Sequence, residues 1–106
     1  MRSLALITPG PAWNDGRPIF DQDAFVLSAH LDAMRDLFDS DVLLMGGPML
    51  GGRSGFALFN TATLADAAEH MNNDPAVRAD IFRFSLQEMI PYFDAFDQTR
   101  HSRPSS

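Results

Sequence analysis

The sequence predicts an α+β domain in which four strands and two helices follow one another in the order strand, helix, strand, strand, helix, strand. Three observations support this order. Short apolar runs are bounded by glycine and proline, two longer segments repeat apolar residues with a helical period, and turn residues separate the elements. The chain has 106 residues, of which 45% are hydrophobic and 21% charged, a balance typical of one folded core.

The first predicted strand is the apolar run from Arg2 to Ile7, which stops at Thr8-Pro9-Gly10-Pro11. The connection that follows extends to about Phe20 and exceeds the usual length of roughly 4 to 6 residues. Connections of this length are typical of functional lids or mobile surface segments. We therefore expect the 9–20 segment to be one or the other.

The first predicted helix extends from Asp21 to Asp39 and has one apolar face. Its apolar side forms two adjacent stripes, and charged side chains fall on the opposite side of the helical wheel. The stripes are Leu27, Leu31, Met34 and Phe38, and Val26, His30, Ala33 and Leu37. His30 thus occupies the centre of the face that is expected to pack on the sheet, where the period favours an aliphatic side chain.

The second and third predicted strands flank a glycine-rich turn. The second covers residues 41–45 and is ended by Gly46-Gly47-Pro48. The third covers residues 55–60 and follows the turn at 51–54. Both strands are short and apolar, as strands within a core usually are.

The second helix and the fourth strand complete the order. Thr63 and Asp66 resemble a capping box, and an apolar stripe continues from there to about Asn72. A short helical turn is predicted after Pro75, and apolar and polar residues then alternate in a strand that covers residues 82–91.

This order is the split βαβ or ferredoxin-like arrangement, in which the four strands form an antiparallel sheet. Residues 1–94 form the single domain, and residues 95–106, which lack an apolar pattern, are predicted to be a flexible C-terminal tail. Two helices cover only one face of a sheet, yet the first three strands are apolar on both sides. We therefore expect a homodimer that packs sheet to sheet.

Composition excludes several classes of protein. The net charge is −6 and the basic residues are scattered, so nucleic acid is not an expected partner. The chain has no cysteine, which excludes disulfides, thiolate metal sites and cysteine nucleophiles. The apolar run at 4–7 is shorter than the core of a signal peptide, and no segment approaches a membrane span. We expect a cytoplasmic protein with no membrane partner.

His30 and Asp74 are the candidate catalytic residues. A histidine on an apolar face needs partners for its ring nitrogens, and it is either a neutral core residue bonded to a backbone carbonyl or a general base. Asp74 precedes Pro75, where an aspartate is a good helix N-cap. If its carboxylate instead reaches the histidine ring, it fixes the tautomer and raises the basicity of the ring.

Other candidates are weaker on sequence alone. Gly47 and Pro48 lie in a turn whose backbone N–H groups are able to face a substrate oxygen, although a plain strand end explains them equally. Arg53 and the loop residues Trp13 and Arg17 are either ligand-closing or ordinary loop side chains. His70 and His101 join no ligand cluster, so neither a metal nor another cofactor is expected.

Several motifs together resemble the YCII-related (YciI-like) family over about Leu4 to Phe93. These motifs are His30-Leu31, Leu43-Leu44-Met45-Gly46-Gly47-Pro48, the glycine-rich turn, Ala67 and Asn73-Asp74-Pro75. The resemblance implies a dimeric α+β barrel and a site built on a histidine and an aspartate, which map onto His30 and Asp74. Related enzymes eliminate HCl from a chlorinated hydroxyquinol or move protons on a lactone ring, so it also implies acid–base chemistry.

Three functions remain open at this point. The first is a cofactor-independent lyase or isomerase in which His30 is the general base, Asp74 orients it, and the substrate is a small polarised organic molecule. The second is a non-catalytic module that binds a small molecule in the same cavity. The third is a structural partner domain of the same fold, in which His30 is only a satisfied core residue.

Overall fold

The computed structural model describes residues 1–97 and confirms the predicted order of elements. The elements are β1 (Arg2–Pro9), the 3-10 helix η1 (Ile19–Asp21), α1 (Ala24–Asp39), β2 (Leu43–Pro48), β3 (Gly55–Asn60), α2 (Leu64–Asn72), α3 (Pro75–Arg78) and β4 (Phe82–Met89). The strands form one four-stranded sheet in the order β2-β3-β1-β4, and every neighbouring pair is antiparallel. This is the α+β, ferredoxin-like arrangement.

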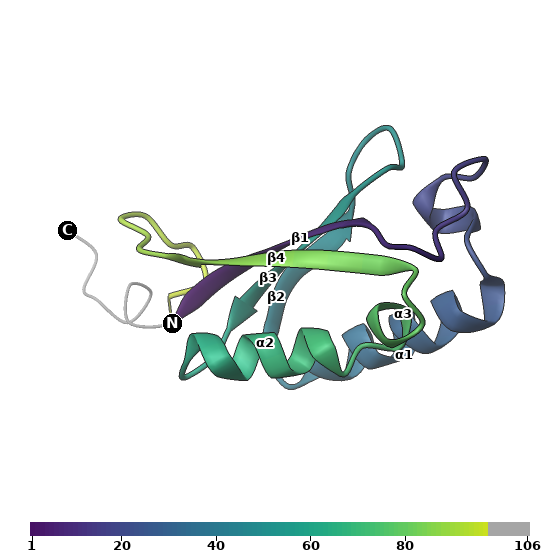
Figure 1. The fold of residues 1–106 in the computed structure, drawn as a ribbon. Coiled ribbons are helices and arrows are strands. Elements are labelled where there is room, and N and C mark those ends of the chain that lie inside the picture. Colours follow the sequence, from purple (N-terminus) through teal and green to yellow (C-terminus); the bar gives the residue numbers. More distant parts are fainter. Residues whose placement is uncertain (98–106) are drawn as a thin grey trace.

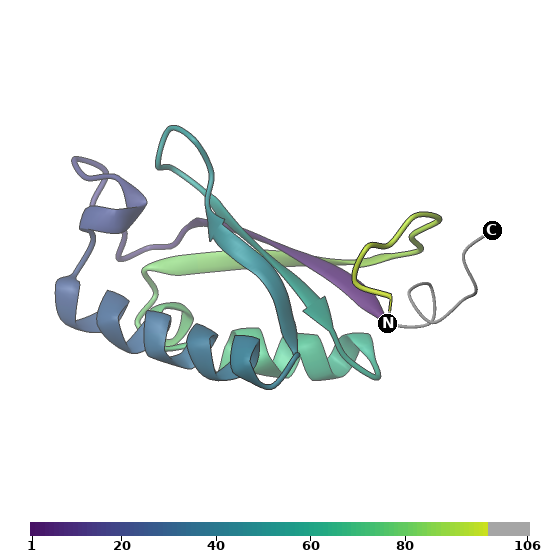
Figure 2. The same ribbon diagram turned by 180° about the vertical axis from the view of Figure 1, so that it is seen from behind.

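The three α-helices, α1, α2 and α3, lie on one side of the sheet, as the two opposite views show (Figures 1 and 2). Along β1, the buried side chains of Ala5 and Ile7 alternate with the more exposed Leu4 and Leu6. The register pairs Leu6 with Phe56 of β3, so the side of the sheet away from the helices is also apolar. The two-sided hydrophobicity expected from the sequence is therefore present.

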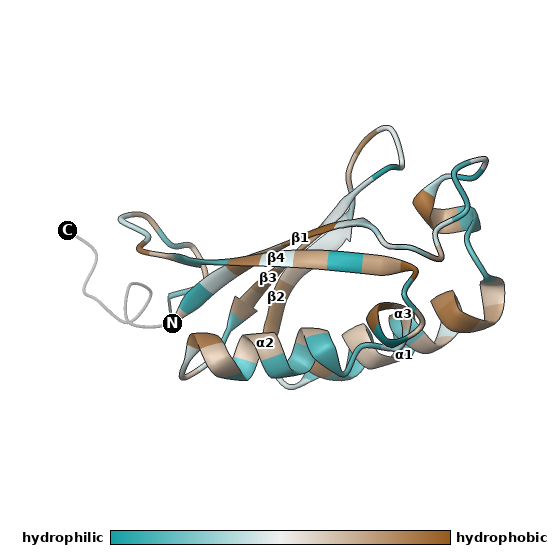
Figure 3. Ribbon diagram, viewed as in Figure 1, coloured by the Kyte–Doolittle hydropathy of each residue, from teal (hydrophilic) through white to brown (hydrophobic). Residues whose placement is uncertain are grey.

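The core between sheet and helices is centred on two fully buried side chains. Phe59 of β3 and Met71 of α2 are both 0% exposed. On β4 the apolar Phe82, Phe84 and Leu86 alternate with polar residues, and Figure 3 shows this alternation as bands along the strand. The strand period of two thus directs the side chains of Phe82, Phe84 and Leu86 toward the core.

Helix α1 begins at Ala24, three residues later than the sequence predicts. Asp23 is its N-cap, and the Asp23 carboxylate accepts a hydrogen bond from the backbone N–H of Val26 at 3.0 Å. The preceding residue, Gln22, has an extended backbone that separates α1 from η1. A turn of 3-10 helix therefore occupies the position at which the pattern predicts the first turn of α1.

The prediction that residues 46–48 end the second strand is wrong. Gly46, Gly47 and Pro48 belong to β2, where they pair with Ala57, Phe56 and Gly55 of β3. Because β2 is an edge strand, proline and glycine cost little there, since one side of the strand has no neighbour to bond. Strand β2 thus begins and ends later than predicted, and its register with β3 is irregular between Leu43 and Met45.

The chain turns back after β4, which ends at Met89 rather than at residue 91. The Arg2 guanidinium donates to Asp94 Oδ2 at 2.6 Å and to Asn60 Oδ1 at 2.6 Å. Its hydrogen bond holds the pKa of the Asp94 carboxyl below the usual range. The backbone N–H of Phe96 also bonds Asp94, so the start of the predicted 95–106 tail is a local turn. Residues 98–106 of that tail lie outside the described residues.

None of the helices in the described part of the chain has both the length and the apolar character that crossing a bilayer requires. The longest, α1, has 16 residues and carries charged side chains on one side.

Removal of the Phe59 ring tests the core. Phe59→Ala should lower the free energy of unfolding by about 3–5 kcal/mol, because the ring is completely buried and its loss leaves a cavity. Urea denaturation followed by circular dichroism measures this change. The matched control is Phe25→Ala, whose ring is 88% exposed and whose loss should cost less than about 0.5 kcal/mol. Equal effects of the two substitutions would contradict this assignment of the core.

Candidate active site

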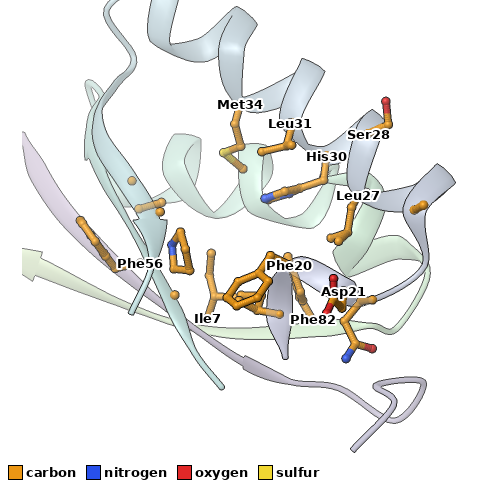
Figure 4. Close-up of a pocket in the computed structure, with 18 of the residues that line it drawn as sticks. Ile7, Phe20, Asp21, Leu27, Ser28, His30, Leu31, Met34, Phe56 and Phe82 are labelled. Carbon is orange, nitrogen blue, oxygen red and sulfur yellow. The ribbon is translucent and has the colours of Figure 1, made fainter. Parts of the chain in front are cut away.

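A cavity of about 580 Å³ separates α1 from the sheet. Although α1 is amphipathic, none of its residues is fully buried, because its apolar face borders this cavity. Figure 4 shows Leu27, Leu31 and Met34 on one side, opposite Ile7 and Phe82 on the strands. The volume and the largely apolar lining are typical of a site for a small organic molecule.

His30 is a polar residue within this apolar lining. It lies in the middle of α1 and, with its side chain 13% exposed, borders the cavity (Figure 4). Its Nδ1 lies 2.7 Å from Asp74 Oδ1, and the Asp74 side chain is 1% exposed. The structure therefore brings together the two residues that the sequence predicts as a pair, across 44 positions of the chain.

Asp74 satisfies both of the roles considered for it. Its Oδ2 accepts hydrogen bonds from the backbone N–H groups of Ala76 at 3.0 Å and Val77 at 3.3 Å, which makes it the N-cap of α3. Its Oδ1 remains for His30. Because one oxygen is held by the backbone, the other has a fixed direction, and the carboxylate becomes a rigid partner for the ring.

The hydrogen-bond pattern fixes the tautomer of His30. A carboxylate only accepts, so the proton of a neutral imidazole lies on Nδ1 and Nε2 is left with its lone pair. No described residue forms a hydrogen bond with Nε2. Phe82 meets the ring edge to face, with centroids 5.1 Å apart and planes at 89°, and this contact restrains the plane of the imidazole.

Gln22 holds the 9–20 loop beside the cavity, a role that no sequence signal indicated. Its side chain is almost completely buried. The backbone N–H of Asn14 donates to the amide oxygen of Gln22 at 2.8 Å, and the amide nitrogen of Gln22 donates to the carbonyl of Asn14 at 2.9 Å. The same amide donates to the carbonyl of Arg17 at 2.9 Å. Because these hydrogen bonds hold its backbone in place, the 9–20 loop forms a fixed wall of the cavity.

The β2–β3 turn is fastened to the same loop. The backbone N–H of Ile19 donates to the carbonyl of Gly52 at 2.6 Å. Gly52 has a φ of +74°, and a Cβ there would lie 2.8 Å from Pro18, so only glycine fits this close approach. The turn and the loop therefore form a continuous rim, from which Phe20 extends to the cavity (Figure 4).

The four predicted substrate-binding residues fall into two groups. Gly47 and Pro48 line the cavity. Trp13 and Arg53 do not lie among the lining residues: Trp13 is buried against Phe82, with ring centroids 6.1 Å apart, and Arg53 points to solvent 3.5 Å from Asp15. Trp13 is a core residue because the loop folds back on the sheet, which its loop composition does not reveal.

The other described histidine has a different environment. His70 of α2 stacks on the ring of Phe59 at 6.4 Å and borders a separate, shallow groove. Among residues 1–97, no three His, Asp or Glu side chains are grouped so that they could hold a metal ion. His101 lies outside the described residues.

Comparison with known proteins finds a family model and solved structures that are similar to this chain. The model of the YCII-related domain matches residues 1–89. Among solved structures, 5-chloro-2-hydroxyhydroquinone dehydrochlorinase from Burkholderia phenoliruptrix AC1100, in complex with 2,5-dihydroxybenzoquinone, superposes with a TM-score of 0.66 at 18% identity. The alignment covers 85% of this chain and 94% of that one, and at this identity it shows a shared fold. No curated protein matches the chain.

The orientation of the His30 ring is testable with Asp74→Asn. Asparagine is as good an N-cap as aspartate, so α3 should persist with its cap oxygen in place. The other atom then becomes an NH₂ donor, which cannot accept from Nδ1–H, and the proton of the neutral ring should move to Nε2. The ¹⁵N shifts of the imidazole distinguish the two tautomers. An unchanged tautomer in the variant would contradict the assigned contact.

Proposed function

Because the chain belongs to the YCII-related domain family, we propose that it is a cofactor-independent acid–base enzyme of the lyase or isomerase type. His30 is the general base and Asp74 orients it. The observation that carries this proposal is the 2.7 Å contact between Nδ1 and a buried carboxylate at the wall of an apolar cavity.

The proposed base is Nε2 of His30. With Nδ1–H donated to Asp74, the lone pair of Nε2 is available to take a proton from a bound molecule. The imidazolium that forms is stabilised by the carboxylate, in the manner of a histidine and aspartate within a catalytic triad. The cap bonds from Ala76 and Val77 keep that carboxylate in place through the proton transfer.

A histidine–aspartate pair transfers protons, and proton transfer is the central step of both an isomerase and a lyase of this type. In an isomerase, the proton taken by His30 returns to another atom of the same molecule. In a lyase, the bond electrons left behind expel a leaving group from the neighbouring atom, and the proton departs from the protein afterwards. Both sequences balance without an oxidant or a second substrate, and both require a proton acidified by a carbonyl or an aromatic hydroxyl.

The substrate is a small, polarised molecule with an apolar body. Cavity walls made of Ile7, Leu27 and Phe82 favour such a body, and Gly47 and Pro48 bring backbone to the same space. The solved neighbour is in complex with 2,5-dihydroxybenzoquinone, a small cyclic molecule with polar carbonyl groups, which is a molecule of this kind. The cytoplasm stays the predicted compartment.

Exchange of carbon-bound protons with D₂O tests the acid–base role without knowledge of the natural substrate. Wild-type protein should accelerate exchange at the methylene beside the carbonyl of phenylpyruvate or of its neutral analogue phenylacetone, as followed by ¹H NMR. His30→Gln should reduce the accelerated rate by about 10²- to 10⁴-fold, the usual contribution of a general base. His70→Gln is the matched control, and it should exchange as fast as wild type.

Three outcomes bear on this proposal. Loss of exchange in His30→Gln alone, with its circular dichroism spectrum unchanged, supports it. Equal exchange rates in wild type and His30→Gln, or no acceleration by either, contradict it. Saturable binding of the ketones without exchange would favour the non-catalytic binding module.

We also propose the sheet-to-sheet homodimer as the working form. The side of the sheet away from the helices carries Leu4, Leu6 and Phe56, and Leu6 is 49% exposed although it is in the middle of a central strand. Within the described residues, no α-helix lies on this side of the sheet (Figures 1 and 2). Such a patch usually marks an association surface, and a sheet face of this kind is self-complementary under a two-fold axis.

Leu6→Glu tests the dimer. A charge in the centre of the proposed interface should convert the protein to a monomer, because it would be buried against an apolar partner surface. Size-exclusion chromatography with light scattering measures the mass. The matched control is Leu50→Glu in the β2–β3 turn, where the leucine is fully exposed and the mass should stay that of a dimer. A wild-type protein of 11.7 kDa in solution would refute the proposal.

A further inference from the structure

Among residues 1–97, Arg17 is the only arginine or lysine that lines the cavity. Its side chain is exposed, and within residues 1–97 its guanidinium forms neither an ion pair nor a hydrogen bond. The other charged side chain of the lining is Asp21 of η1, which makes no ion pair with Arg17. A cation without a partner is thus held at the edge of an apolar space.

The backbone of Arg17 is fixed although its side chain is free. The N–H of Arg17 donates to the carbonyl of Asn14 at 3.0 Å, and the carbonyl of Arg17 accepts from the buried Gln22 amide at 2.9 Å. The next residues are held by the bond between Ile19 and Gly52. Burial of a glutamine is costly unless its amide is used, and here the amide is used entirely on residues 14–18.

We propose that Arg17 selects the substrate of this cavity, and that this substrate is a small apolar anion such as an aryl or alkyl carboxylate. The inference rests on the proposed function, because it concerns the same cavity, and it adds the charge of the substrate. The apolar body lies between α1 and the sheet, and the carboxylate stays at the rim with the guanidinium. Arginine suits this position because its planar fork bonds both oxygens of a carboxylate.

Asp21 gives a second test of the charge of the ligand, because its side chain has a charge opposite to that of Arg17. If the natural ligand were a cation, Asp21 would be the binding group and Arg17 would repel the ligand. The two side chains therefore predict opposite effects of neutral substitution. For an anionic ligand, loss of Arg17 weakens binding and loss of Asp21 strengthens it.

Binding of two stable isosteres tests this selection. Phenylacetate and phenylacetamide differ in charge but hardly in shape. The chain has one tryptophan, Trp13, and its ring packs on Phe82 of the cavity wall, so its fluorescence reports occupancy. Wild type should bind phenylacetate roughly tenfold or more tightly than phenylacetamide, as a charge-assisted pair implies.

Four variants isolate the role of Arg17. Arg17→Gln should abolish the preference for phenylacetate and leave the affinity for phenylacetamide unchanged, whereas Arg17→Lys should retain part of it. Asp21→Asn should tighten binding of phenylacetate alone. The matched control is Arg35→Gln, on the exposed side of α1 and outside the cavity lining, which should leave both affinities as in wild type.

The result that would overturn the inference is an equal preference in wild type and Arg17→Gln. Stronger binding of phenylacetamide than of phenylacetate, weaker phenylacetate binding in Asp21→Asn, or binding of neither probe also overturns it. Failure of the acid–base proposal is distinguishable, because it shows as unchanged proton exchange in His30→Gln while the preference for phenylacetate persists. Failure of the inference alone leaves that exchange dependent on His30.

Discussion

The carboxylate of Asp74 is the contact on which the site depends, because it connects two helices that the sheet alone does not align. One oxygen caps α3, and the other bonds His30 in the middle of α1. Since α1 has no fully buried residue, hydrophobic packing fixes its position less strictly than that of α2. A buried charge-assisted bond therefore sets where the imidazole lies relative to the sheet.

The cavity beneath α1 has a physical cost, since its lining side chains forgo the packing that a filled core would supply. The chain keeps that space open by fastening its walls independently. Gln22 holds the loop, and Gly52 permits the β2–β3 turn to meet it. These contacts do not run through the cavity, so a molecule is able to enter without dismantling them. Such a preformed site loses little conformational entropy when it binds.

The two sides of the sheet have different roles, since one forms the core and the other is the proposed dimer surface. Ala5, Ala57 and Phe59 face the helices and form the core, whereas Leu6 and Phe56 lie on alternate positions. Phe56 also borders the cavity, near the β2 edge of the sheet. The proposed dimer surface and the proposed site thus meet at one strand, β3. The packing of the proposed dimer surface is therefore expected to influence the shape of the proposed site.

The sequence by itself determined the order of strands and helices, the caps at Thr63 and Asp74, and the anomaly of His30, because these depend on period and on neighbours within a few positions. It misplaced the end of β2, since pairing with β3 overrides the turn preference of Gly46 and Gly47. Only the tertiary structure decided that Asp74 reaches His30, that Gln22 and Arg17 border the cavity, and that Trp13 is buried. Each of these is a contact between segments distant along the chain or within an irregular loop, for which no periodic pattern exists.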